Sequence, residues 1–154
     1  MSDVISDFFD RDALISLYKA QGWTSAEFAR QAGLNKNMIS RYERGLSTPR
    51  PAYIVRLAET LGVEPATLYR VEEYDKDLSY FRIINGYSIA ALSVKLGMKS
   101  NNSVVSMEMG NTELSPQMRR SLSEIFGISE AKVRQAWQRS REYTLNRDLR
   151  RKAS

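Results

Sequence analysis

The chain has 154 residues, a length that suits one ordinary domain or two very small ones. It contains no cysteine and no histidine, which excludes disulfide scaffolds, thiolate nucleophiles and catalytic triads that use histidine. Carboxylate and lysine chemistry remain available, but the composition argues against an enzyme. We therefore expect no catalytic residues, no metal ion and no cofactor.

The net charge of +5 is distributed unevenly along the chain. Residues 1–74 have a balance of −1, residues 75–131 are neutral, and residues 132–154 carry +6. A basic excess of this kind points to nucleic acid or another anionic surface. No apolar run is long enough to cross a membrane, and the first residues do not resemble a secretory signal, so we expect a cytoplasmic protein.

Capping and apolar residues predict five short helices in the first seventy residues. Thr24 and Glu27 have the spacing of a capping box, and Asn35 suits the N-cap of the next helix. The expected helices begin at or beside Arg11, Thr24, Asn35, Pro51 and Pro65, and the first four end at Gly22, Gly33, Gly45 and Gly62. No window alternates with a period of two, so the fold should be all-α.

The second half of the chain repeats the first. With a shift of 64 residues, increasing to 65 after one inserted residue near 99–102, glycines, prolines and apolar positions coincide while most polar positions differ. The matching pairs include Leu14 with Leu78, Gly33 with Gly97, Ile39 with Val104, Glu43 with Glu108, Pro51 with Pro116, and Leu57 with Leu122. This pattern indicates two copies of one fold whose surfaces have diverged.

The repeat predicts a second set of helices at residues 77–85, 88–96, 102–109 and 116–126, followed by a helix capped by Ser129. The run 130–151 has no glycine or proline, so this last helix should be long. It either packs on the second domain with a basic outer face or lays its arginines along phosphates, and the two interpretations are compatible. We expect domains at 1–71 and 77–154, joined by a stiff connector at 72–76.

Residues 24–45 resemble the core of the lambda-repressor-like (Cro/CI, Xre-type) helix-turn-helix family. The run Ile39-Ser-Arg-Tyr-Glu-Arg-Gly45, a following proline and then Leu57-Ala-Glu carry the resemblance. It covers about residues 11–70 strongly and 77–135 weakly. It implies two tandem five-helix domains with a long C-terminal helix, and a second helix of the motif that enters the major groove of double-stranded DNA.

The resemblance places the first domain's DNA contacts on and around this second helix. Asn37 has the chemistry to read adenine, and Arg41 or Lys36 the chemistry to read guanine. Arg44 and Arg50 flank the following loop, where such proteins touch phosphate. The complete set of expected contacts is Ser25, Lys36, Asn37, Ser40, Arg41, Arg44 and Arg50.

The second domain departs from this pattern. Its turn has an extra residue, Ile89 replaces Ser25, and Val105 replaces Ser40. The polar turn favours a second reader of bases or phosphates, although a degenerate copy that serves packing or dimerisation remains open. The candidate contacts are Lys99, Ser100, Asn101, Asn102, Ser103 and Ser106.

The sequence thus predicts a sequence-specific DNA-binding transcription regulator that acts as a repressor. In its small size the chain resembles phage immunity repressors, including those of mycobacteriophages. Two different recognition helices in one chain imply an asymmetric site that a monomer can bind, with weak self-association through the C-terminal helix. Such a protein acts in the cytoplasm of a bacterium or of a phage-infected host cell. The alternatives are an antitoxin or plasmid-type regulator that dimerises through the second domain, and an adaptor whose second helix-turn-helix binds protein.

Overall fold

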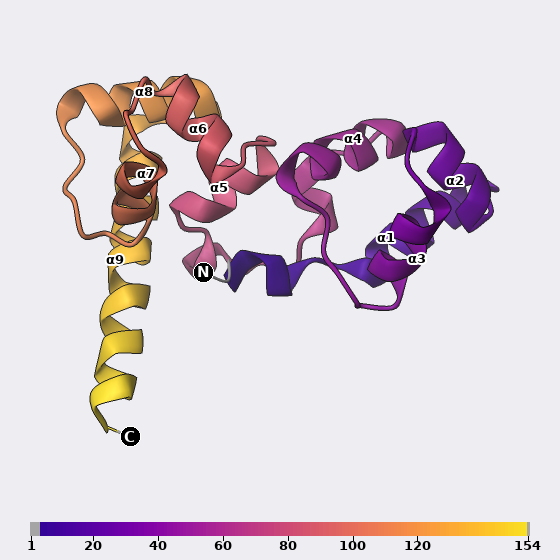
Figure 1. The fold of residues 1–154 in the computed structure, drawn as a ribbon, viewed down its shortest axis with the longest axis horizontal. Helices are drawn as coiled ribbons and strands as arrows, with labels where there is room; N and C mark the ends of the chain where they lie inside the picture. Colours follow the sequence, from indigo (N-terminus) through magenta and orange to yellow (C-terminus); the bar gives the residue numbers. More distant parts are fainter. Residues whose placement is uncertain (1–3, 154) are drawn as a thin grey trace. The chain divides into compact units, whose positions relative to one another are not determined.

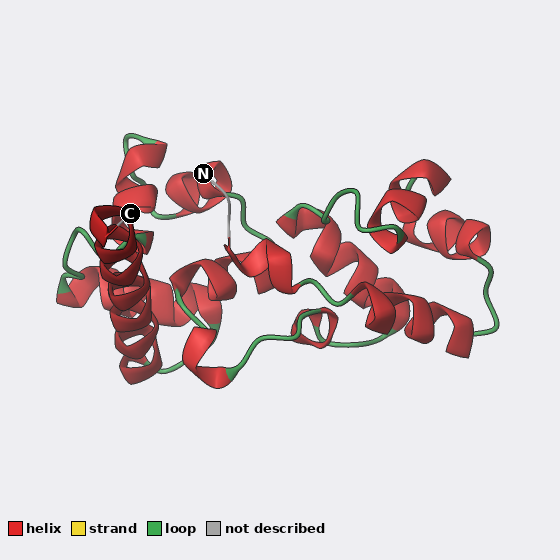
Figure 2. Ribbon diagram, turned by 90° about the horizontal axis from the view of Figure 1, so that it is seen from below, coloured by secondary structure: helices red, strands yellow, loops and turns green. Residues whose placement is uncertain are grey.

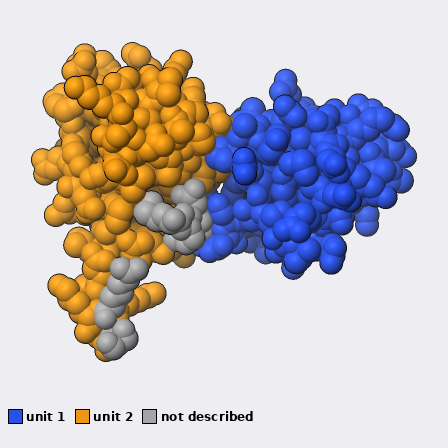
Figure 3. All heavy atoms as spheres, in the orientation of Figure 1, with its two compact units in different colours: residues 1–71 blue, residues 72–154 orange. Residues whose placement is uncertain are grey.

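The computed structural model describes residues 4–153 (Figure 1). Residues 1–3 and 154 belong to the predicted domains but lie outside the described part. The described residues form helices and loops, with no strand and a single isolated bridge between Phe9 and Tyr69 (Figure 2). The prediction of an all-α fold is therefore confirmed. The chain divides into two compact units, Met1–Val71 and Glu72–Ser154 (Figure 3).

The first unit has four α-helices: α1 (Arg11–Ala20), α2 (Ser25–Ala32), α3 (Lys36–Glu43) and α4 (Pro51–Leu61). Two 3-10 helices, Val4–Phe8 and Pro65–Leu68, precede and follow them. The fifth helix expected at Pro65 is thus a single 3-10 turn. Its chain continues in an extended conformation because Leu68 accepts a backbone hydrogen bond from Asp10 (2.8 Å) and Arg70 donates one to Phe8 (2.9 Å).

The second unit has five α-helices after a 3-10 helix at Glu73–Asp75. They are α5 (Leu78–Ile84), α6 (Ile89–Lys95), α7 (Asn101–Glu108), α8 (Pro116–Phe126) and α9 (Glu130–Ala153), so α7 begins one residue earlier than predicted. Most of the segment expected as a connector is part of this unit's structure. Lys76 pairs with Glu73 at 2.9 Å, and its carbonyl accepts a hydrogen bond from Arg139 at 3.2 Å.

Residues that the sequence repeat pairs have the same role in the core of each unit. Leu14, Phe28, Ile39 and Leu57 are completely buried in the first unit, as are their counterparts Leu78, Leu92, Val104 and Leu122 in the second. The second core also includes Val133 and Ala136 from α9. Burial of these apolar side chains holds the short helices together, since helices of seven to eleven residues are marginal by themselves.

The long helix α9 has two parts with different surroundings. Ser140 is buried, accepts a hydrogen bond from the backbone of Leu78 (3.2 Å) and donates one to Ala136 (3.1 Å). The first half of α9 is therefore fixed to its unit. The distal half continues beyond the other helices of that unit (Figure 1).

Candidate nucleic-acid interface

Local capping builds the two helices of the motif and the turn between them. Thr24 accepts a hydrogen bond from the backbone of Glu27 at 3.1 Å, so the N-terminal half of the predicted capping box forms. Gly33 ends α2 with φ +68°, a left-handed conformation that glycine adopts without strain. Asn35 then starts α3 by accepting a hydrogen bond from the backbone of Asn37 at 2.7 Å.

The rotation of α3 about its axis is set by the residues that it buries. Ile39 and Tyr42 face the core, which leaves the other side of the helix to solvent. Lys36, Asn37 and Arg41 are exposed on that side, and Ser40 is half-buried. Helix α3 thus presents an amide and two cations to solvent, with Lys36 and Asn37 in its first turn and Arg41 in its last.

The loop after α3 adds further cations to this surface. Arg44 and Arg50 are both exposed. Arg41 and Arg50 line one open hollow of about 380 Å³, together with Met38, Tyr42, Ser47, Thr48 and Tyr53. Within the described part of the chain, the side chains of Lys36, Arg41, Arg44 and Arg50 make no hydrogen bond or ion pair, so their charges are available to an anion.

Ser25 differs from the other candidates of the first unit. It is the first residue of α2 and is half-buried, and its hydroxyl oxygen is buried without a well-formed hydrogen bond. That hydroxyl lies close enough to Tyr18 to lower the pKa of Tyr18 slightly against the stronger effects that raise it. The structure therefore turns the Ser25 side chain inward, whereas Lys36, Asn37 and Arg41 point to solvent.

A partly buried hydrogen bond holds α3 against α1. The Tyr18 hydroxyl donates to Glu43 Oε1 at 2.6 Å. Burial of Tyr18, together with the Glu43 carboxylate beside it, raises the pKa of Tyr18 to about 12. The neighbour that reaches the Glu43 carboxylate is thus a tyrosine.

In the second unit, an ion pair holds the equivalent helix α7 against α5. The repeat aligns Tyr18 with Arg82 and Glu43 with Glu108, and Arg82 Nε lies 2.7 Å from Glu108 Oε2 with both side chains buried. Arg82 also donates to the carbonyl of Tyr87 at 3.0 Å. The contact ties α7 to α5 and to the turn before α6, as the tyrosine ties α3 to α1.

The polar candidates of the second unit occupy the start of α7 and the turn before it. Lys99, Ser100, Asn101, Asn102 and Ser103 are exposed. Ser106 is half-buried, and its hydroxyl forms a hydrogen bond of 2.7 Å with that of Thr112. This unit therefore presents amides and hydroxyls to solvent, with Lys99 as the one cation among its six candidates.

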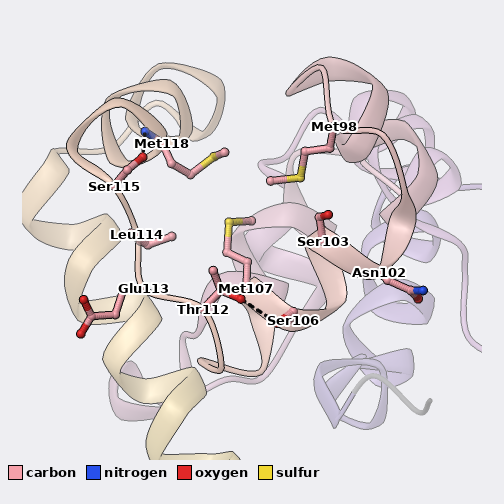
Figure 4. A pocket seen from close by; sticks show the side chains of 10 residues that line it. All are labelled: Met98, Asn102, Ser103, Ser106, Met107, Thr112, Glu113, Leu114, Ser115 and Met118. Carbon is pink, nitrogen blue, oxygen red and sulfur yellow. Dashed lines mark hydrogen bonds between the residues drawn. The ribbon is translucent and has the colours of Figure 1, made fainter.

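A groove beside α7 corresponds position by position to the cationic hollow of the first unit (Figure 4). Its volume is about 450 Å³. With the shift of 65 residues, Ser106 stands for Arg41 and Ser115 for Arg50, while Glu113 replaces Thr48. The apolar part of its lining consists of Met98, Met107, Leu114 and Met118. We therefore call it the methionine groove.

Helix α9 fixes the loop that borders this groove. The Trp137 indole N–H donates to the carbonyl of Thr112 at 3.0 Å, and Arg141 donates to that of Gly110 at 3.4 Å. Gly110 has φ +72°, and a methyl group on it would overlap the Cα and Cβ atoms of Arg141. The long helix thus fixes the backbone of the loop between α7 and α8.

Sequence reasoning missed several residues of the first unit's surface. Ser47, Thr48 and Tyr53 line the hollow beside Arg41. Their positions in a loop and a helix do not by themselves indicate that they belong to this surface. The Arg11 guanidinium lies against Gly45, so it adds a cation beside the end of α3. Arg11 reaches this position only because α1 packs against the loop that follows α3.

The fold and the exposed strip of α3 define a helix-turn-helix domain. A comparison with family models agrees, because residues 14–68, roughly a third of the chain, match the family described as Helix-turn-helix. This family comprises DNA-binding regulators, and the match supports such a role in general for this chain. Searches of curated proteins and of solved structures find no significant match.

No helix in residues 4–153 combines the length and apolar character that crossing a membrane requires. Within the same residues, no three acidic side chains come together in a way that would hold a metal ion.

Proposed function

We propose that this protein is a sequence-specific transcription regulator of the phage-repressor kind, which reads an asymmetric DNA site with two recognition helices from one chain. The observation that carries the proposal is the exposed strip of Lys36, Asn37 and Arg41 on α3. A bidentate amide and two cations on the exposed side of a recognition helix match the donors and acceptors of the major groove.

The loop cations complement this strip. Arg44 and Arg50 are exposed and unpaired within the described residues, so they are suited to phosphates on either side of the groove. Phosphate contacts orient the domain, and contacts from Asn37 and Arg41 would give it specificity. Ser40 lies on the same helix, and Ser25, with its inward hydroxyl, has the weakest support of the first unit's candidates.

The second unit is proposed to read the other half of the site through α7 and its turn. Asn101 and Asn102 are exposed at the start of that helix, and asparagine amides pair well with adenine. Because this surface has few cations, the second unit should contribute more to specificity than to salt-dependent affinity. One chain would then cover both half-sites, which are joined at high effective concentration.

Selection of bound sequences from random DNA, performed with the full chain, tests the proposal. We expect a non-repeating site that binds one chain. Asn37→Ala should relax base preference in one half of that site and Asn102→Ala in the other, with each change costing about 1–3 kcal/mol at the affected base. A palindromic site occupied by two chains would contradict the architecture.

A second candidate function has a specific observation in its favour. The methionine groove lies on the reading side of the second unit and contains no cation, which is a surface better suited to protein than to DNA. In that case the first unit alone binds DNA, and the second serves dimerisation or an adaptor role. Unchanged base preference in Asn102→Ala, with an intact effect of Asn37→Ala, would favour this candidate.

A further inference from the structure

Exposed apolar side chains are concentrated on the distal half of α9. Six large apolar residues are exposed among those described, and three of them lie within seven positions of this helix. Tyr143, Leu145 and Leu149 expose 44%, 50% and 63% of their surface. Clustered exposed apolar residues mark an interaction surface more often than single ones do. We call residues 142–153 the tail segment.

The two leucines are arranged to enter a groove together. Leu145 and Leu149 are four residues apart on a continuous helix, so they lie one turn apart on one face. Arg150 and Lys152 follow on the same segment. A helix with two adjacent apolar side chains and flanking cations is typical of helices that bind in an apolar groove of another protein.

The methionine groove is such a site. Met98 from the turn before α7, Met107 from α7 and Met118 from α8 point into a common space (Figure 4). Methionine side chains are flexible and polarisable, so they adapt to an inserted side chain. The only charged residue in the lining is Glu113, which complements the basic tail segment. Arg119 and Arg134 line an adjoining hollow together with Glu113, and their positive charges partly offset the negative charge of Glu113.

The tail segment of a chain cannot fill the groove of the same chain. The first half of α9 is held to its unit by the Trp137 and Ser140 hydrogen bonds, and the helix continues without a break through Ala153. Thr144 is buried and Arg147 half-buried, but Leu145 and Leu149 are exposed, and the end of the helix extends away from the other helices of the unit (Figure 1). An occupant from this protein must therefore come from a second molecule.

We propose that the methionine groove receives the tail segment of a second copy of the chain, with Leu145 and Leu149 entering it. Two copies can exchange tail segments reciprocally and so form a closed dimer. The apolar contact is small, so the dissociation constant should be on the order of 100 μM.

This docking has a consequence that rests on the proposed function. Asn102, Ser103 and Ser106 line the same groove, so a docked tail segment covers part of the surface proposed to read DNA. Self-association and DNA reading by the second unit then exclude each other. Binding of DNA by the first unit is unaffected by this competition.

Sedimentation of the full chain over a wide concentration range is the first test. We expect reversible dimers at high concentration, which both the double variant Leu145→Glu/Leu149→Glu and the groove variant Met118→Glu abolish. Leu46→Glu is the matched control, since Leu46 is a similarly exposed apolar residue of the first unit, at 52%, and should leave dimers intact. A wild-type chain that stays monomeric throughout would overturn the proposal. So would loss of dimers in the tail variant alone, because the tail segments would then pair with each other.

A second measurement does not depend on the folding of a groove variant. A synthetic peptide of residues 139–153 is added to full-length protein whose methionine methyl groups carry ¹³C. The methyl signals of Met98 and Met118 should shift, while that of Met38 in the first unit should not. Unchanged signals, or equal shifts at Met38, would contradict docking in the groove. If the wild-type chain at low concentration does not bind DNA in a separate assay, the proposed function is wrong. The evidence for docking of the tail segment in the groove is then unaffected.

Discussion

At the scale of single residues, the two units anchor the equivalent helices α3 and α7 by different chemistry. Tyr18 donates a neutral hydrogen bond to Glu43, whereas Arg82 forms a buried ion pair with Glu108. The first arrangement avoids burying a cation. The second must satisfy two buried charges, so it is more sensitive to the loss of either partner.

Tyr18 gives the first unit a characteristic dependence on alkaline pH. Its pKa is about 12 in the folded chain and near the ordinary 10.0 when unfolded. Between these values the unfolded chain loses the tyrosine proton first, so the free energy of unfolding falls as pH rises, by about 2–3 kcal/mol in total. Denaturation followed by circular dichroism should show this decline in the wild type and a smaller one in Tyr18→Phe. Parallel declines would contradict the assignment.

Substitutions at Arg82 compare the ion pair of the second unit with the tyrosine hydrogen bond of the first. Arg82→Met leaves Glu108 buried without its cation and should cost about 3–5 kcal/mol of stability. Arg82→Tyr supplies a hydroxyl in the place of Tyr18 and should be less destabilising than Arg82→Met. Trp137 fluorescence in a Trp23→Phe background reports unfolding of the second unit. Equal losses in both variants would show that the hydroxyl does not replace the guanidinium.

At the scale of elements, α9 determines the conformation of the loop between α7 and α8. Trp137 and Arg141 hold the backbone at Thr112 and Gly110, and this loop borders the methionine groove. The first unit has no equivalent helix, because its chain after α4 forms only the 3-10 turn Pro65–Leu68. The two units therefore differ most in what supports the loop after the recognition helix.

A pair of glycine substitutions separates the effect of this packing from that of backbone conformation. Gly97 and Gly110 have φ values of +69° and +72°, but only Gly110 faces another helix, since nothing lies within 4 Å of a methyl group added at Gly97. Gly97→Ala should cost about 1–2 kcal/mol of stability, from the left-handed conformation alone. Gly110→Ala should cost at least about 3 kcal/mol, because α9 must also move away. Chemical denaturation checks both values, and similar costs would mean that α9 does not press on the loop.

At the scale of the whole molecule, the cations are concentrated on the surface around α3 and in the basic segment 132–154. The first unit combines exposed Lys36, Arg41, Arg44 and Arg50 with a remainder of residues 1–71 that has a balance of −3, and residues 132–154 hold a balance of +6. DNA affinity should therefore fall steeply with salt, by about 0.9 in the log–log slope for each phosphate contacted.

The salt dependence gives a prediction for the loop cations. The double variant Arg44→Gln/Arg50→Gln should reduce the slope by about 2 and weaken binding to all sequences alike. Arg70→Gln is the control, because this arginine already pairs with Asp10 at 3.2 Å. Fluorescence anisotropy of labelled DNA at several salt concentrations provides the slopes. A changed base preference in the double variant would mean that these arginines contact bases.

Much of the fold was predictable from local signals. The glycines 22, 33, 45 and 62 end or follow helices where expected, and Thr24, Asn35 and Ser129 cap the helices predicted to start beside them. These signals are reliable because they act within one turn of backbone. The exception at Pro65 is a non-local effect, since the pairing of Phe8 and Asp10 with residues 68–70 ends the turn.

The sequence by itself determined the helices, the core positions and which polar residues lie on α3 and α7, because these follow from periodicity and capping. The tertiary structure alone decided which side chains share a surface. It turned the Ser25 hydroxyl inward, paired Glu43 with Tyr18, placed Arg11 beside Gly45 and gave the second unit a methionine groove where the first has a cationic hollow. Such contacts join residues far apart in the chain, and their partners depend on how the helices pack.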